Sequence, residues 1–253
     1  AAYERDLAHP GGSESYTDYW TLARLSNMPM CEMSEVDVNS HDTYIFAPNN
    51  GNVKALLSQP HTCKAIHWEL ERPGTELFPH FDEMWVSDKT QLQMAKQLSP
   101  EANVKYVPLG GHKLLGGKPA IPKIWDLVPM CYAYGDRAAK LHELATHGFT
   151  IAPSTFEPRE RDAILAHSRW GLMLHQTPHP IMTPLRAVLY ACWRLPILAE
   201  TVGDSYPYKF IQYDPDLDIL GCHSEETIEG LFDFNYRIAT EEFTFRACIE
   251  AAL

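Results

Sequence analysis

Short apolar runs alternate with amphipathic segments along most of the second half of the chain. The apolar runs have the length and composition of strands, and the segments between them carry apolar residues at helical spacing. Such alternation is typical of a parallel sheet that helices cover on both faces. The predicted strands cover residues 128–134, 149–153, 170–176, 196–200 and 209–214, and the predicted helices cover residues 137–147, 158–168, 184–194 and 224–232.

The first half of the chain follows the same alternation less regularly. The two halves are separated by GGHKLLGGKPAIPKIW, residues 110–125, whose four glycines and two prolines are typical of an interdomain linker. We therefore expect an α/β protein with two domains, residues 1–120 and residues 121–253. The predicted strands of the first half cover residues 43–48, 63–69, 82–88 and 104–108, and the predicted helices cover residues 16–26, 50–58 and 89–97.

Charge and hydropathy argue against several classes of protein. Asp and Glu number 33 against 21 Lys and Arg, which gives a net charge of −12 and makes a nucleic-acid partner unexpected. No apolar run approaches the roughly 20 residues of a membrane span, and the first residues lack the layout of a signal peptide. We expect a cytoplasmic protein without stable membrane insertion.

Sequence motifs for metals and common cofactors do not occur. The six cysteines form no C-x-x-C pair, and HQTPHP at residues 175–180 has no neighbouring Cys or acid at ligand spacing. Neither a G-x-G-x-x-G after a strand, nor a G-x-x-x-x-G-K-[ST], nor a G-x-S-x-G is found, so dinucleotide, P-loop and nucleophile-elbow enzymes are not indicated. We expect neither a bound metal nor a cofactor.

A permanent cation stands at the start of an apolar helix in PIMTPLRAVLYACWRLPILAE, residues 180–200. Thr183 is suited to cap this helix and Pro184 to open it. Arg186 then lies in the first turn, where free N–H groups and the helix dipole already favour an anion. Because a guanidinium adds bidentate hydrogen bonds to phosphate, the pattern predicts a phosphate site; a surface ion pair is the alternative.

Other polar residues follow the predicted strands of the second half. In a parallel sheet the carboxyl ends of the strands share one edge, where ligands bind. Arg137, Lys140 and Arg186 are therefore predicted to face one diphosphate, with Glu200 available for a sugar or ribose hydroxyl. The alternative is that Arg137 and Lys140 lie on a solvated helix face and that Glu200 anchors a loop. The predicted donor-binding residues of this edge are Gly135, Arg137, Lys140, Thr183, Arg186, Glu200 and Thr201.

The order of these elements resembles that of a known family. RERDAILAHSRWGLMLHQ, the helix of Arg186 and LPILAE follow one another as in the C-terminal half of group 1 nucleotide-sugar glycosyltransferases, which have the GT-B fold. YAYGDRAAK is similar to the Gly-Arg-Lys element that holds their donor diphosphate, and YVPLGGH is similar to the segment that closes their N-terminal domain. GGSESYTDYWTLARL, residues 11–25, resembles the Gly-Gly start of their first helix.

The resemblance implies two Rossmann-like domains, with an abbreviated N-terminal domain because residues 1–10 supply no convincing strand. It implies transfer of a sugar from a UDP- or GDP-sugar to a glycan or other hydroxyl acceptor. Retention of configuration and independence of divalent metals are implied as well. In this comparison Gly12 approaches the donor, and Glu14 in the same segment is a candidate catalytic residue.

The densest polar cluster of the first half is AIHWELERPG, residues 65–74, at the end of a predicted strand. His67, Glu69 or Glu71 could orient an acceptor hydroxyl there, or serve as a general base if the reaction inverts configuration. The alternative is that loop hydrogen bonds satisfy these groups. We take His67 and Glu69 as candidate catalytic residues.

One departure from the family leaves a second function open. Ile181 and Leu189 occupy the two positions at which the family usually carries a pair of glutamates separated by seven residues. A non-catalytic module that binds a nucleotide or a glycan is therefore the alternative to a glycosyltransferase. A weaker alternative is another two-domain α/β enzyme, such as a sugar-phosphate isomerase.

Overall fold

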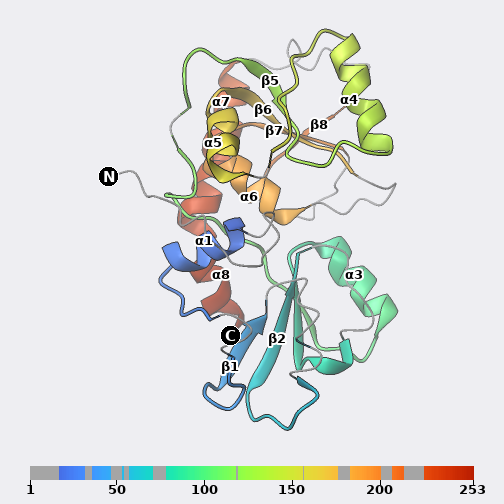
Figure 1. Cartoon of the computed structure of the whole chain (residues 1–253), viewed down its shortest axis with the longest axis vertical. Coiled ribbons are helices and arrows are strands. Elements are labelled where there is room, and N and C mark those ends of the chain that lie inside the picture. Colours follow the sequence, from blue (N-terminus) through green and yellow to red (C-terminus); the bar gives the residue numbers. More distant parts are fainter. Residues whose placement is uncertain are drawn as a thin grey trace.

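The structure is a computed structural model that describes the residues 17–31, 36–46, 53, 57–70, 78–117, 119–155, 157–175, 183–200, 207–213 and 225–253. Within these residues the chain forms two parallel sheets of four strands each (Figure 1). The strand order is β1-β2-β3-β4 in the first sheet and β5-β6-β7-β8 in the second. The predicted α/β fold with two Rossmann-like sheets is confirmed.

The first sheet is built from the strands that the sequence predicts. Its third strand is buried along its whole length, as expected of a strand that has neighbours on both sides. Of the predicted helix 50–58, only Val53 and Leu57 lie among the described residues. The elements of this half are α1 (Thr17–Leu25), β1 (Thr43–Phe46), β2 (Lys64–Glu69), η3 (Phe78–His80), β3 (Glu83–Val86), α3 (Lys89–Leu98) and β4 (Val104–Tyr106).

The second sheet packs through β6 and β7 against an apolar helix, α6, which begins at Pro184 and is buried at every position except Arg186. Burial on nearly all sides explains why its sequence is apolar almost throughout. The elements of this half are β5 (Trp125–Val128), α4 (Asp136–Thr146), α5 (Pro158–Ala166), β6 (Ser168–Met173), α6 (Pro184–Cys192), β7 (Ile197–Ala199), β8 (Ile211–Gln212), α7 (Glu225–Arg237), η4 (Ile238–Glu242) and α8 (Phe245–Ala252).

Two strand predictions of the second half need correction. The strand predicted at residues 128–134 ends at Val128, and residues 129–134 form a loop. Pro129 gives the physical reason, because proline has no N–H to donate within the interior of a sheet. The strand predicted at 149–153 is reduced to a single bridge between Ile151 and Leu127.

The last helix of the chain returns to the first sheet, beside α1 (Figure 1). The ring of Phe245 on α8 stacks on Trp68 of β2, with ring centroids 5.6 Å apart. Lys105 of β4 donates through Nζ to the carbonyl oxygen of Ala252 at 3.2 Å. The chain therefore passes between the two sheets a second time after residue 240. Because residues from both ends of the chain then lie beside the first sheet, the domain boundary near residue 120 stays a prediction.

The linker and the returning chain lie in direct backbone contact. Gly111 forms a parallel bridge with Thr244, and its N–H donates to the carbonyl oxygen of Ala239 at 2.9 Å. A Cβ atom at Gly110 would lie 2.0 Å from the carbonyl oxygen of Phe243. Only glycine permits so close an approach of two backbones. The glycines of the predicted linker are thus packing positions as well as turn formers.

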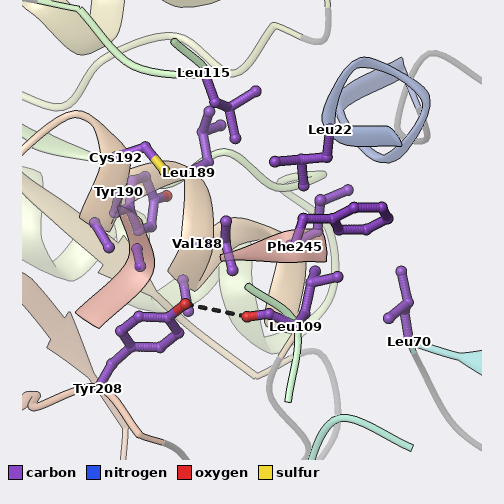
Figure 2. Packing of buried hydrophobic residues seen from close by; sticks show 14 of the residues in the cluster. Leu22, Leu70, Leu109, Leu115, Val188, Leu189, Tyr190, Cys192, Tyr208 and Phe245 are labelled. Carbon is purple, nitrogen blue, oxygen red and sulfur yellow. Dashed lines mark hydrogen bonds between the residues drawn. The ribbon is translucent and has the colours of Figure 1, made fainter. Parts of the chain in front are cut away.

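One cluster of buried side chains runs through both halves of the molecule (Figure 2). Tyr208 is fixed within it, because its hydroxyl donates to the carbonyl oxygen of Leu109 at 3.1 Å. The two sheets therefore share a continuous core. Members from α1, the segment after β2, the segment after β4, the linker, α6 and α8 are Leu22, Leu70, Leu109, Leu115, Val188, Leu189, Tyr190, Cys192 and Phe245.

Candidate functional site

The described donor-site candidates gather at the carboxyl edge of the second sheet. Arg137 follows β5 at the start of α4, Arg186 lies in the first turn of α6, and Glu200 directly follows β7. Because β5, β6 and β7 pair in parallel, the chain leaves all three strands at the same edge. The sequence prediction that these residues share one edge is therefore consistent with the sheet topology.

Arg186 is held by the residue that begins its helix. Its Nη2 donates to Oγ1 of Thr183 at 2.8 Å. Thr183 is the N-cap residue of α6, but its hydroxyl makes no capping bond with the helix backbone and accepts from Arg186 instead. The Nη1 nitrogen of Arg186 is buried and has no hydrogen-bond partner. A buried donor left unmatched costs free energy, which an acceptor from a bound ligand would recover.

Arg137 is almost fully buried, with 8% of its surface exposed. Its Nε donates to the carbonyl oxygen of Leu174, just after β6, at 3.0 Å. Burial lowers the pKa of this guanidinium, and the positive charge of Arg186 lowers it further. Two cations therefore lie close enough to repel each other, which is the arrangement that a polyanionic ligand would relieve.

The positive charges of both arginines act on the buried thiol of Cys131. Burial raises the pKa of Cys131, and the positive charges of Arg186 and Arg137 oppose that rise. The two arginines, 49 residues apart along the chain (186 minus 137), thus act on the same group. The sequence does not single out Cys131, because it lies within the apolar run 128–134 that satisfies the strand pattern.

Lys140 and Glu200 do not stand free at this edge. The ammonium group of Lys140 forms an ion pair with Oε1 of Glu200, and Oε2 of Glu200 accepts from the backbone N–H of His175. The residues predicted to contact phosphate and ribose thus contact each other. An ionised carboxylate offers about four acceptor positions, so Glu200 retains capacity for a further donor.

Gly135 is the N-cap residue of α4 at the same edge. Its φ of 59° lies in the left-handed region that favours glycine, and it caps the helix without a side-chain hydrogen bond. The backbone of the preceding loop is fixed at Cys131, whose N–H donates to Oγ of Ser154 at 3.2 Å while that hydroxyl donates to the Cys131 carbonyl oxygen. Gly135 therefore sets the direction from which α4 and Arg137 approach the edge.

The candidate catalytic pair lies in the first sheet. His67 and Glu69 on β2 are both buried, and Nε2 of His67 lies 3.2 Å from Oε2 of Glu69. The His67 ring packs against Phe81 with ring centroids 4.9 Å apart, and its Nδ1 is buried without a hydrogen-bond partner. The structure brings these two residues together. The candidates Gly12, Glu14 and Thr201, with Glu71, lie outside the described residues.

The described part of the chain contains no group of three or more His, Cys, Asp or Glu side chains arranged to hold a metal ion. Five cysteines in that part are free thiols: Cys31, Cys63, Cys131, Cys192 and Cys248. In the same part, every helix is too short or too polar to cross a membrane.

No model of a known protein family matches the chain, and no curated protein matches it. Among solved structures, sucrose-phosphate synthase from Thermosynechococcus elongatus aligns with a TM-score of 0.57 and 10% identity, over 97% of this chain and 78% of that chain. TarM aligns with a TM-score of 0.56 and 10% identity, over 87% of this chain and 55% of that chain. This chain therefore spans little more than half the length of TarM. These likenesses show the fold, which is that of GT-B proteins with two Rossmann-like domains.

Proposed function

We propose that the protein is a glycosyltransferase of the group 1 type that moves a sugar from a UDP- or GDP-sugar to a hydroxyl acceptor. The observation that carries this proposal is the convergence of Arg137 and Arg186 at the edge where α6 begins. Two mutually repelling guanidinium groups, one with a buried unmatched nitrogen, are suited to a diphosphate. The GT-B fold supports the same reading, because the proposed site lies at the ligand-binding edge of an α/β sheet.

The two arginines would act on the leaving group. As the bond from the sugar to the diphosphate breaks, negative charge grows on the diphosphate oxygens. Arg137, Arg186 and the positive end of the α6 dipole are already in place to stabilise that charge, which lowers the barrier without reorganising the protein. Because this positive charge comes from the chain itself, we propose that the reaction requires no divalent metal or cofactor.

Glu200 would bind the donor while it stays paired with Lys140. The ion pair holds the carboxylate in position, and an unused acceptor position would receive a ribose or sugar hydroxyl. Lys140 then serves chiefly to orient Glu200, with a smaller direct contribution to the phosphate. Gly12, Gly135 and Thr201 complete the proposed donor site, in which Gly135 acts through its backbone.

His67 and Glu69 are proposed for the acceptor side, in the domain formed by residues 1–120. If the Nε2 hydrogen of His67 is donated to Glu69, the lone pair of Nδ1 is left to accept a proton from an acceptor hydroxyl. Such a base serves a reaction that inverts configuration, whereas the family resemblance favours retention. We propose that the anomeric configuration is retained and that Glu14 is a further catalytic candidate. We propose a glycan as the acceptor.

A second candidate function is a binding module that does not turn over its ligand. It is favoured by Leu189, which stands at one of the two positions of the family's paired glutamates and is buried in the core. An apolar side chain there cannot contact a sugar hydroxyl as a carboxylate would. The proposed diphosphate site at Arg137 and Arg186 would be unaffected, so nucleotide binding is expected under both functions.

The test combines binding with turnover. The protein is titrated with UDP, GDP and their sugar conjugates in a calorimeter, and the release of UDP or GDP from each conjugate is followed with and without glycan acceptors. Binding with nucleotide release supports a glycosyltransferase, and binding without release supports the module. A protein that binds none of these ligands would contradict both functions. The anomeric configuration of the product, read by NMR, separates retention from inversion.

A further inference from the structure

Two exposed tyrosines stand beside the arginine site. Tyr132 and Tyr134 expose 58% and 51% of their surface. Among the residues whose side chains the structure describes, no other tryptophan, tyrosine or phenylalanine is exposed to this degree. Their rings stack on each other with centroids 6.1 Å apart and an angle of 28° between the planes. Large aromatic rings are usually buried, so a stacked pair in solvent requires an explanation.

The two tyrosines lie on the loop of residues 129–134, whose backbone is held in a conformation of the kind found at ligand sites. Met130 has a φ of 37°, and Gly135 at the other end of the loop has a φ of 59°. A left-handed conformation is unfavourable for methionine and persists only where the surroundings enforce it, often at ligand sites. Here the enforcing contacts are the two hydrogen bonds between Cys131 and Ser154. The tyrosines are therefore presented from a fixed loop.

The tyrosine pair adjoins the proposed diphosphate site. The loop leaves the carboxyl end of β5 and runs into α4, where Arg137 is only three residues after Tyr134. The Tyr134 phenol also lies close enough to Arg137 to affect the pKa of its guanidinium. A ligand bound at Arg137 and Arg186 through its phosphates would thus have flat aromatic surface within reach of its remaining parts.

We propose that Tyr132 and Tyr134 form a stacking platform for the nucleobase of the donor. The inference rests on the proposed function and adds to it the site of the base. A nucleobase is itself aromatic and carried one ribose away from the phosphates, so it can extend the tyrosine stack. Such stacking depends on ring area rather than on hydrogen bonds, which predicts that uracil and guanine are both accepted and that guanine, with the larger ring system, is bound more tightly.

The experiment compares ligands that differ only in the parts attached to the phosphates. Calorimetry measures the dissociation constants of inorganic pyrophosphate, UDP, GDP and UDP-glucose for wild type, Tyr132→Ala, Tyr134→Ala and the two Phe variants. We expect each Ala variant to weaken UDP and GDP by about 5-fold to 150-fold and to leave pyrophosphate unchanged. The Phe variants keep the ring and should bind as wild type does. Ile124→Ala, an exposed apolar residue before β5 at the opposite edge, is the matched control.

Any other outcome contradicts the proposal that the two tyrosines form a stacking platform for the nucleobase. Unchanged UDP binding in both Ala variants removes the tyrosines from the base site. An equal loss for pyrophosphate shows that the substitutions disturb the arginine loop, and a loss for UDP-glucose alone assigns the rings to the sugar. The proposed donor site is judged separately by Arg186→Ala: if this variant weakens UDP while the Ala variants of the tyrosines do not, the donor site stands and the platform fails. A wild-type protein that binds no nucleotide refutes both.

Discussion

Lys140 on α4 and Glu200 after β7, which lie 60 residues apart along the chain, form an ion pair at the edge of the second sheet. The carboxylate also accepts from the backbone of His175, so it ties α4 to the ends of two strands. Both side chains are largely shielded, with 33% of Lys140 and 15% of Glu200 exposed. This pair therefore differs from the solvated ion pairs elsewhere on the surface.

We expect this pair to contribute measurably to stability. A double-mutant cycle with Lys140→Ala and Glu200→Ala, followed by urea unfolding, should give a coupling free energy of about 1 kcal/mol, at the upper end for such pairs. The exposed i,i+4 pair of Arg246 and Glu250 on α8 is the control, with an expected coupling of about 0.3 to 0.5 kcal/mol. A coupling for Lys140 and Glu200 no larger than that of the control would contradict the structural role of the pair.

Replacement of Arg186 tests the donor site. Arg186→Ala removes a charged donor and should weaken UDP binding by about 1 to 3 kcal/mol, as measured by calorimetry. Arg186→Lys keeps the charge but loses the forked geometry, so it should restore only part of the affinity. Arg169→Ala is the control, because Arg169 lies near the amino end of β6, at the opposite edge of the sheet. An unchanged dissociation constant for Arg186→Ala would remove this residue from the site.

The edge that carries the site could be predicted because its signals are local. Thr183 and Pro184 mark the start of α6, and an apolar run marks its burial. Strand and helix alternation then fixes which ends of the strands share an edge. Whether that edge binds phosphate is not contained in the pattern, and the roles of these residues stay predictions.

What the sequence could not predict depends on contacts between distant residues. The pairing of Lys140 with Glu200 requires α4 to pack beside the end of β7, and the stacking of Phe245 on Trp68 requires α8 to return to the first sheet. Position along the chain says little about either contact. The error at β5 had a different cause, because the apolar run 128–134 satisfied the strand pattern although Pro129 interrupts it.

Acid should destabilise the first sheet through Glu83. Burial alone would raise the pKa of this buried carboxyl, but hydrogen bonds from Lys105, Trp85 and Lys64 outweigh burial and lower it. A group whose pKa is lower in the folded state stabilises the protein above its unfolded pKa, and this contribution is lost as pH falls through the folded pKa. In urea unfolding between pH 7 and pH 3, Glu83→Gln should flatten the acid side of the stability profile. An equally steep loss in the variant would assign acid sensitivity to other carboxylates.

The close approach of the linker to the returning chain gives the last prediction. A Cβ atom at Gly110 would meet the carbonyl oxygen of Phe243 at 2.0 Å, and backbone cannot move aside as a flexible side chain could. Gly110→Ala should therefore lower the free energy of unfolding by at least about 2 kcal/mol, measured in urea. Gly230→Ala is the matched control, because Gly230 lies exposed in α7 with open space around its Cβ position. That variant should gain about 0.5 to 1 kcal/mol, since alanine favours a helix interior. Equal effects of the two substitutions would mean that the backbone contact at Gly110 does not hold the two halves together.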